Sequence, residues 1–381
     1  MTRYLIVGAG LAGDMAAKGI RDHDPDGPIT IVGAEPERTY KRPLLSKGLW
    51  SGSPEEKLWK QPADGVELVT GRRIVSLDLD GHTARDDAGG DHAWDKVVLA
   101  TGARPREIPG ADGVIWFRTL ADYRALRERA GEGSRVVVIG GGFIGSELAA
   151  SLRGVGAEVT MVFPDPGIGH RLFPAPLSEF VTGYYRDKGV EVLSGERVTK
   201  ASGTRVWLGS GRELEADAVV AGLGVVPNVE LAEAAELEVD NGIVVDDRGR
   251  ASGRDDVFAA GDVANFPLLP LGVSTRIEHE DHANAHGRAV GANMAGADAP
   301  YDYLPLFYSD LFDLGYEAVG QVDSRLATVE RWDEPNRKGV VAFVDDARRP
   351  RGYLLWNVWD TVDAARELLR AGEPLGHGPG V

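Results

Sequence analysis

The sequence predicts an α/β protein with two Rossmann-like dinucleotide-binding domains and a C-terminal α+β domain. An apolar strand, a glycine-rich turn and a helical pattern occur in this order twice. They form YLIVGAGLAGDMAAKGI (residues 4–20) and VVVIGGGFIGSELAASL (residues 136–152). From about residue 299 the pattern changes to short alternating strands, followed by one helix.

The composition is that of an ordinary globular protein and limits the classes of function. The chain has 381 residues, enough for two or three domains, and a formal net charge of −17. Nucleic acids and anionic membranes need a basic surface on their partner, so we expect neither as a partner. No apolar run approaches the ~20 residues that span a bilayer, and a predicted strand begins too early for a signal peptide. We therefore expect a cytoplasmic enzyme.

The first glycine turn has the features of a pyrophosphate-binding turn. Gly8 permits the tight turn, Gly10 lets the backbone approach the ligand, and Gly13 lets helix and strand pack closely. The pyrophosphate would lie at the N-terminus of the helix predicted at Leu11–Ile20, where free N–H groups favour an anion. The next strand, ITIVGAE, ends at Glu35, which suits a ribose diol. The alternative is a chance glycine turn.

The second glycine turn repeats this arrangement. Gly140, Gly142 and Gly145 follow the apolar segment RVVVI and precede a second helical pattern. We therefore expect a second dinucleotide to bind here in the same way as the first. The alternative is that one of the two turns is vestigial and only packs against its sheet.

The residues after the second turn favour NADH over NADPH. The strand AEVTMVF ends at Phe163, where NAD-binding units often have an acidic residue, and Asp165 follows two residues later. A negative charge there favours the ribose hydroxyls of NAD over the phosphate of NADP. His170 and Arg171 follow closely in the sequence and would offset this charge, so NADPH remains the alternative.

Three further apolar segments indicate how the domains are connected. KVVLATGARPR (residues 96–106) precedes the second turn's domain, and ADAVVAGLGVVPNVEL (residues 216–231) follows it. DVFAAGDVANF then places Gly261 and Asp262 at a strand end, before a further helix. Asp262 would bind a ribityl chain or a cation, or else it caps its helix. We predict a first domain at 1–108 and 229–298, a second at 109–228 and a third at 299–381.

The sequence resembles the two-dinucleotide flavoprotein reductases, and within them the ferredoxin reductase and apoptosis-inducing-factor group. Besides the two turns, three segments match: YKRPLLSKGLW (residues 40–50), RIEHEDHANAHGRAVGANMAG (residues 276–296) and LPLFYSDLFDLGYEAVGQVD (residues 304–323). The resemblance covers nearly the whole chain. It implies a glutathione-reductase-like architecture with FAD on the first domain and NADH on the second. A prokaryotic-type member fits best, because the insertion of mitochondrial members is absent between Val329 and Val341.

The chain contains no cysteine, which limits how electrons leave the flavin. Relatives that reduce disulfides or peroxides need a redox-active thiol, but the corresponding segment here reads Leu44-Leu45-Ser46-Lys47. Electrons must therefore pass from reduced flavin directly to an external acceptor. The candidates are a ferredoxin-type Fe–S protein, a quinone and oxygen.

The resemblance implies an ion pair between Lys47 and Glu147. The family has such a lysine near flavin N5, where its charge would stabilise the reduced flavin, and Glu147 would contact the nicotinamide amide. A buried lysine also needs a partner, because an isolated charge in a low dielectric is costly. The alternative is a surface lysine and an ordinary glutamate on a helix face.

The resemblance extends to the residues that would contact each cofactor. Those for FAD are Gly8, Gly10, Leu11, Ala12, Gly13, Glu35, Arg42, Pro43, Lys47, Ala100, Thr101, Gly102, Arg106, Gly261, Asp262, Glu278, His279 and Tyr308. Those for NAD are Gly140, Gly142, Phe143, Ile144, Gly145, Glu147, Asp165, Arg171, Gly222 and Gly224. The candidate catalytic residues are Lys47, Glu147 and His279. Phe143 would shield the flavin until nicotinamide displaces it, or else is a core side chain.

Two positions depart from the family pattern. Tyr308 stands where relatives commonly have tryptophan. Glu280 likewise stands where relatives that reduce ferredoxin often have tryptophan. His279, His282 and His286 share one helical face, which has an alternative interpretation as a metal site. We expect no metal, because His279 has a flavin role in the family and the other two suit packing or solvent.

The C-terminal domain would cover the open side of the flavin, form a dimer face, or be a lid without a partner. Its predicted strands are EAVGQVD, LATVERW, GVVAFVD and RGYLLWNVW, followed by a helix at Thr361–Ala371. We expect the last segment, GEPLGHGPGV, to be disordered.

Two functions from different classes fit this sequence. The first is an NADH-dependent reductase, whose ferredoxin partner would need a local basic patch near the flavin. Candidate residues for that patch are Arg72, Arg73, Arg104, Arg106, Arg348, Arg349 and Arg351. The second is an apoptosis-inducing-factor-like sensor, in which NADH forms a long-lived charge-transfer complex that controls dimerisation or partner binding.

Overall fold

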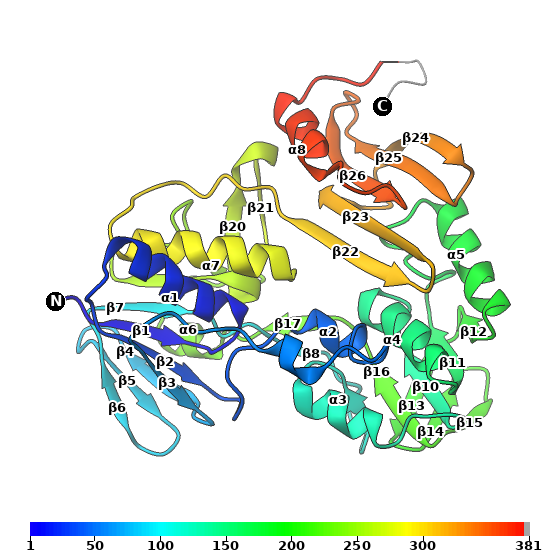
Figure 1. Ribbon diagram of the computed structural model, residues 1–381, viewed down its shortest axis with the longest axis horizontal. Coiled ribbons are helices and arrows are strands. Elements are labelled where there is room, and N and C mark those ends of the chain that lie inside the picture. The colour runs from blue at the N-terminus through cyan, green and yellow to red at the C-terminus, as the bar shows by residue number, and fades with distance from the viewer. Residues whose placement is uncertain (377–381) are drawn as a thin grey trace. The chain divides into compact units, whose positions relative to one another are not determined.

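The computed structural model describes residues 1–376, which group into two compact units (Figure 1). The first unit comprises Met1–Lys41, Glu56–Arg104 and Val226–Pro305, and the second contains the remaining residues. The chain passes between the units within β8 (Ala103–Pro105) and β17 (Val225–Pro227), among other points.

The first unit is built on an all-parallel sheet in the order β19-β7-β1-β2-β3. Its strands are β1 (Tyr4–Val7), β2 (Ile29–Gly33), β3 (Val66–Thr70), β7 (Lys96–Leu99) and β19 (Val257–Ala259). β1, the central strand, is buried along its whole length because both faces of a parallel sheet are covered. Its C-terminal end leads into the first glycine turn.

Two long helices of the first unit, α1 (Leu11–His23) and α7 (Glu280–Met294), pack directly against each other (Figure 1). Small residues make this approach possible. A Cβ atom on Gly287 would overlap the backbone of Ala12, and one on Gly291 would overlap the backbone of Ala16. The pattern of small residues in both helices therefore specifies this close contact.

Smaller elements complete the first unit. They are β4 (Ile74–Asp78), β5 (Thr83–Asp86), β6 (Asp91–Ala93), α6 (Glu230–Ala234), β18 (Ile243–Val244), β20 (Ala264–Leu268) and β21 (Val273–Thr275), with 3₁₀ turns at Gly261–Val263 and Leu269–Leu271. A further helix does follow Asp262, as expected, but not directly. A single 3₁₀ turn leads into the antiparallel pair β20–β21, and the next helix is α7. Asp262 lies inside that turn, so it does not cap a helix.

The second unit contains another five-stranded parallel sheet, in the order β12-β11-β10-β16-β9. Its strands are β9 (Ile115–Trp116), β10 (Arg135–Ile139), β11 (Glu158–Phe163), β12 (Glu191–Ser194) and β16 (Ala218–Ala221). The helices are α2 (Pro43–Ser46), α3 (Leu120–Arg127), α4 (Phe143–Gly154) and α5 (Ala175–Asp187). An antiparallel sheet of β13 (Val198–Ser202), β14 (Arg205–Leu208) and β15 (Glu213–Glu215) lies between β12 and β16 in the chain. β10 is again the central strand that leads into a glycine turn.

The C-terminal residues of the second unit form an antiparallel sheet in the order β22-β23-β26-β25-β24, with one helix (Figure 1). The elements are β22 (Leu306–Leu311), β23 (Leu314–Gly320), β24 (Ala327–Glu334), β25 (Lys338–Val344), β26 (Pro350–Trp356) and α8 (Val362–Ala371). The predicted α+β fold of this region is confirmed. β22 is an edge strand, and α4 packs against it.

Two details differ from the expectations. The segment Arg42–Glu55, which we assigned to the first domain, groups with the second unit, because α2 packs against α3 and α4. We expected the last segment, GEPLGHGPGV, to be disordered. Its residues as far as Gly376 are ordered, because Leu375 and Gly376 accept hydrogen bonds from Arg348. The rest of that segment, 377–381, lies outside the described residues. The division into three domains stays a prediction.

None of the helices in residues 1–376 is both long enough and apolar enough to span a membrane.

Candidate functional site

The two glycine turns have the same backbone conformation. Gly8 has φ +121° and Gly140 has φ +124°, a region that favours glycine. A Cβ atom on Gly8 would overlap the carbonyl of Ala100, and one on Gly140 would overlap the carbonyl of Gly222. The end of each central strand therefore requires glycine, as the motif predicts.

The middle glycine of each turn is where a dinucleotide would fit. A Cβ atom built on Gly10 or on Gly142 meets no atom within 4 Å. These two glycines are the N-caps of α1 and α4, where free backbone N–H groups point outward. Each turn thus leaves open space in front of a helix N-terminus, which fits the pyrophosphate of one dinucleotide.

The loop after β2 in the first unit lies against the first glycine turn. Glu35 follows β2, as predicted, and accepts a hydrogen bond of 2.5 Å from the Tyr40 hydroxyl. The Thr39 hydroxyl donates to the carbonyl of Ala9, inside the turn. Thr39 and Tyr40 therefore hold the acidic residue beside the turn. Sequence reasoning missed this role, because neither residue belongs to the glycine motif.

The turn at Gly261 and Asp262 in the first unit is held by two side chains that the sequence did not place at this turn. The N–H of Gly261 donates to Nδ1 of His286 (3.3 Å), and Arg276 donates to the carbonyl of Asp262 (3.1 Å). The Arg276 side chain is 7% exposed and forms an ion pair of 2.6 Å with Glu278. Arg276 thus connects two predicted FAD residues, Asp262 and Glu278. Its position in the matched segment RIEHED was the available signal.

The predicted histidines occupy different environments. His279 is the N-cap of α7, whereas His282 and His286 are fully buried and their rings stack at 4.8 Å. Burial lowers the pKa of His286 to about 3 and that of His282 well below its usual value. His282 and His286 are therefore neutral packing residues. No group of three metal-ligand side chains occurs in residues 1–376, so the metal interpretation gains no support.

The other predicted FAD residues divide between the two units. Ala100, Thr101 and Gly102 follow β7 in the first unit, where Thr101 and Asn228 exchange two hydrogen bonds of 2.8 Å. Five belong to the second unit, and they are Arg42, Pro43, Lys47, Arg106 and Tyr308. Arg42 donates to the carbonyl of Arg118, and the N–H of Arg106 donates to the carbonyl of Gly224.

The predicted NAD residues all lie in the second unit. Ile144 and Gly145 are in the first turn of α4, and Gly222 and Gly224 follow β16. Asp165 follows β11 and forms an ion pair of 3.6 Å with Arg171. The Arg171 side chain is 83% exposed, so this pair is weak and screened by water. Arg171 therefore offsets the charge of Asp165 only in part.

The expected pair between Lys47 and Glu147 is present in the second unit. Nζ of Lys47 lies 3.1 Å from Oε1 of Glu147, and the two side chains are 13% and 6% exposed. The alternative of a surface lysine is therefore wrong. Nζ of Lys47 also lies 4.0 Å from the centre of the Tyr308 ring and 4.0 Å from Asp310. The pair brings together α2, α4 and β22.

Two serines that we did not predict complete this cluster. The Ser46 hydroxyl donates to Oε2 of Glu147, and the Ser309 hydroxyl donates to Oε1, each over 2.6 Å. Both carboxylate oxygens are therefore occupied by donors. The family segment containing Lys47 gave a signal for Ser46, whereas Ser309 had none beyond its neighbour Tyr308.

Aromatic side chains enclose the Glu147 cluster. Phe143, at the start of α4, packs edge-on against Phe307 at 5.3 Å between ring centres. Burial and the nearby charge of Glu147 raise the pKa of Tyr185 and that of Tyr316 well above the usual value of a phenol. Both phenols stay protonated, so neither adds a charge beside the ion pair of Lys47 and Glu147.

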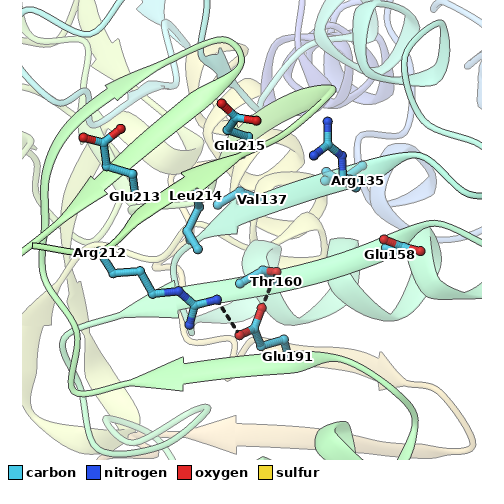
Figure 2. Close-up of a pocket in the computed structure, with 10 residues that line it drawn as sticks. Arg135, Val137, Glu158, Thr160, Glu191, Arg212, Glu213, Leu214 and Glu215 are labelled. Atoms are coloured by element: carbon cyan, nitrogen blue, oxygen red, sulfur yellow. Dashed lines mark hydrogen bonds and ion pairs between the residues drawn. The ribbon is translucent and has the colours of Figure 1, made fainter. Parts of the chain in front are cut away.

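A separate hollow of about 300 Å³ lies at the start of strands β10, β11 and β12 (Figure 2). Its lining is mostly charged, and Glu191 accepts hydrogen bonds from Arg212 and Thr160, each over 2.9 Å. The glycine turn follows the other end of β10, so this hollow contains none of the predicted site residues.

The fold and these sites define a pyridine-nucleotide-dependent flavoprotein oxidoreductase. The family model described as "Pyridine nucleotide-disulphide oxidoreductase" matches residues 2–287, and one described as "Apoptosis-inducing factor, mitochondrion-associated, C-term" matches residues 290–337. The chain belongs to the pyridine nucleotide-disulphide oxidoreductase family. Its cofactors are FAD and a nicotinamide dinucleotide, and it passes electrons to an external acceptor.

Individual relatives refine this assignment. The chain is 36% identical to the "Anthranilate 1,2-dioxygenase system ferredoxin--NAD(+) reductase component" of Burkholderia cepacia, over 97% of this chain and 94% of the relative. It is 31% identical to "Apoptosis-inducing factor 1, mitochondrial" of Dictyostelium discoideum, over 96% and 78%. A chain of the "covalent putidaredoxin reductase-putidaredoxin complex" superposes with a TM-score of 0.91 at 29% identity, over 98% and 94%. The resemblance to the ferredoxin reductase and apoptosis-inducing-factor group is confirmed.

Proposed function

We propose that this protein is an NADH-dependent reductase of a small ferredoxin-type Fe–S protein, with Lys47 and Glu147 as its central catalytic pair. The observation that supports this most is the buried ion pair of 3.1 Å between them. Bound FAD supplies the capacity to take a hydride and release its electrons to the acceptor. The chain supplies orientation and charge.

The role of Lys47 is to hold a positive charge that favours the reduced flavin. Its ammonium group is mostly buried, and Glu147 keeps it in place. A charge fixed in this way needs no reorganisation during the reaction, which makes electrostatic stabilisation effective. Glu147 has the additional proposed role of binding the nicotinamide amide, because Oε2 accepts one hydrogen bond, from Ser46, and a carboxylate oxygen has more than one acceptor site. His279, as N-cap of α7, is the third proposed catalytic residue.

The proposal of a ferredoxin-type acceptor is supported by the names of the relatives. The relative from Burkholderia cepacia is a ferredoxin–NAD(+) reductase component, and the superposed solved structure is a reductase in complex with putidaredoxin. Quinone and oxygen are the competing acceptors. The preference for NADH is supported by Asp165, whose charge Arg171 offsets only in part. A homodimer and a cytoplasmic location remain predictions from the sequence.

The second candidate function is an NADH sensor, favoured by the match of the C-terminal model and of the Dictyostelium relative. A sensor would hold its reduced flavin for a long time in the presence of every acceptor. It would also change its oligomeric state when NADH is added.

Stopped-flow reduction of the flavin by NADH tests the catalytic pair. We expect Lys47→Ala to slow reduction far more than it weakens FAD retention, because the fixed charge acts mainly on the reduced form. Lys57→Ala is the matched control, since Lys57 is exposed and lies outside the predicted site. Unchanged reduction in Lys47→Ala contradicts the proposal. Fast cytochrome c reduction only after ferredoxin is added favours the reductase over the sensor.

A further inference from the structure

The carboxylate of Glu147 is held by hydroxyl groups from two distant parts of the chain. Ser46 ends α2 and Ser309 lies in β22, and each donates a 2.6 Å hydrogen bond to a different oxygen of Glu147. We infer that Ser46 and Ser309 are positioning residues, which hold Glu147 so that it fixes the Lys47 ammonium. This inference rests on the proposed catalytic function of Lys47 and Glu147.

Few other groups could take over this task. Glu147 is 5% exposed, and Ser46 and Ser309 are each 1% exposed, so bulk water does not reach the two hydrogen bonds. Hydrogen bonds to an ionised carboxylate are among the shorter and stronger ones in proteins, and 2.6 Å is in that range. Removal of one hydroxyl leaves part of a buried charge without its donor, which is costlier than the loss of a neutral contact.

Each serine is itself held firmly. The carbonyl of Ser46 accepts a hydrogen bond of 2.7 Å from Ser151 in α4, the helix that also carries Glu147. Ser309 is paired with Tyr316 in the β22–β23 register, and the phenol of Tyr316 interacts with the Ser309 hydroxyl. The donors therefore come from fixed backbone positions, as the orientation of a charged group requires.

The geometry links these serines to Lys47 rather than only to the fold. Oε1 of Glu147 receives both the Ser309 hydroxyl and the Lys47 ammonium, so a shift of this oxygen moves the ion pair. The buried Ser178 provides a contrast. Its hydroxyl donates to the carbonyl of Ile168, and no hydrogen bond or ion pair connects it to Lys47 or Glu147 in the described part of the chain. A hydroxyl with only a structural role should behave like that of Ser178.

The test compares Ser309→Val with Ser309→Thr, two side chains of the same shape that differ by the hydroxyl. We expect Ser309→Val to slow flavin reduction by NADH about tenfold, equal to the loss of about 1.4 kcal/mol of transition-state stabilisation, and Ser309→Thr to restore most of the rate. The flavin midpoint potential is the second readout. It should become more negative in Ser309→Val, because a displaced Lys47 stabilises the reduced flavin less. Ser46→Ala should act in the same direction, and Ser178→Ala should change neither quantity.

The double variant Lys47→Met, Ser309→Val separates positioning from folding. If Ser309 acts through Lys47, Ser309→Val causes no further slowing once Lys47 is removed. The inference is overturned if Ser309→Val slows flavin reduction as much in the Lys47→Met protein as in the wild type. It is also overturned if Ser309→Val and Ser309→Thr reduce the flavin at equal rates. An unchanged rate in Lys47→Met alone refutes the catalytic role of the pair, and this inference with it. Different results would therefore contradict the proposed function and the positioning roles of the two serines.

Discussion

The ammonium group of Lys47 lies over the ring of Tyr308, 4.0 Å from its centre. The same ammonium group is within 3.4 Å of the Tyr308 carbonyl. Tyr308 therefore binds Lys47 through both its ring and its backbone.

The first prediction concerns the Tyr308 ring. Tyr308→Leu should slow flavin reduction by about two- to fivefold, because a cation–π contact at a partly exposed site contributes about 0.5–1 kcal/mol. Tyr308→Trp should keep the rate, since indole offers a better ring face to the cation. Stopped-flow absorbance measures both. A slower Tyr308→Trp variant would show that the hydroxyl, rather than the ring, is what matters.

The second prediction concerns the open space at Gly142. Gly142→Ala should fold normally, because its φ of −89° suits alanine and its new Cβ meets no protein atom. The methyl group would occupy the space of the dinucleotide, so we expect the Kd for NADH to rise by about tenfold, or 1.4 kcal/mol. Thermal unfolding tests whether Gly142→Ala folds normally, and NADH titration tests whether its Kd rises.

Gly140→Ala is the contrasting variant for this prediction. Its φ is positive and its Cβ would overlap the Gly222 carbonyl, so it should lower the melting temperature. Normal NADH affinity in Gly142→Ala would mean that the dinucleotide does not approach this turn.

The third prediction concerns the choice between NADH and NADPH. Asp165→Asn should lower the ratio of kcat/KM for NADH to that for NADPH by about two- to fivefold, a small effect because the site is exposed and screened. Arg171→Ala should raise the same ratio, because it leaves Asp165 without its ion-pair partner. Steady-state kinetics with both nucleotides measure the ratio. A change in the same direction in both variants would contradict this assignment.

The fourth prediction concerns pH and the buried His286. Its pKa is about 3 in the folded protein, whereas an unfolded histidine titrates near 6.5. Between these values the unfolded chain binds a proton that the native protein does not. Stability therefore falls as the pH decreases from about 6.5 toward 3, by up to about 1.4 kcal/mol per pH unit.

His286→Asn should weaken the fall in stability at low pH, because asparagine does not titrate, while the buried His282 still contributes to it. Its amide oxygen also accepts a hydrogen bond, which can replace the acceptor for the N–H of Gly261. Melting temperatures of the wild type and of His286→Asn between pH 4 and pH 7 measure the difference in pH dependence. Parallel curves for the two proteins would contradict the prediction.

Local sequence patterns predicted the glycine turns well, because the strand–turn–helix motif itself requires glycine at these positions. Gly8 and Gly140 each follow a central strand and lie against the carbonyl group that follows the adjacent strand, at Ala100 and Gly222. This geometry recurs wherever the motif occurs. The distance from Asp262 to the next helix could not be predicted in this way. A Gly-Asp step at a strand end fits several continuations, and here tertiary pairing of β20 with β21 decided the outcome.

Residues that act through long-range contacts could not be found from local patterns. Ser309 lies far along the chain from Glu147, and serine in a strand has no periodic signal that indicates a charged partner. Packing and exposure to solvent were both left open for His286, and the structure buries it. Its hydrogen bond to Gly261 depends on how α7 lies beside the 3₁₀ turn. The resemblance supplied Lys47 and Glu147 as a pair, whereas the burial and partners of the pair came from the structure.

The contact between α1 and α7 has a consequence for biosynthesis. α1 is among the first segments to leave the ribosome, but the glycines that receive it, Gly287 and Gly291, follow more than 260 residues later. The parallel sheet around β10 is completed by β16, well before α7 is translated. All five strands of that sheet are therefore synthesised while the small-residue face of α1 still lacks α7, which makes this face a natural site for chaperone protection.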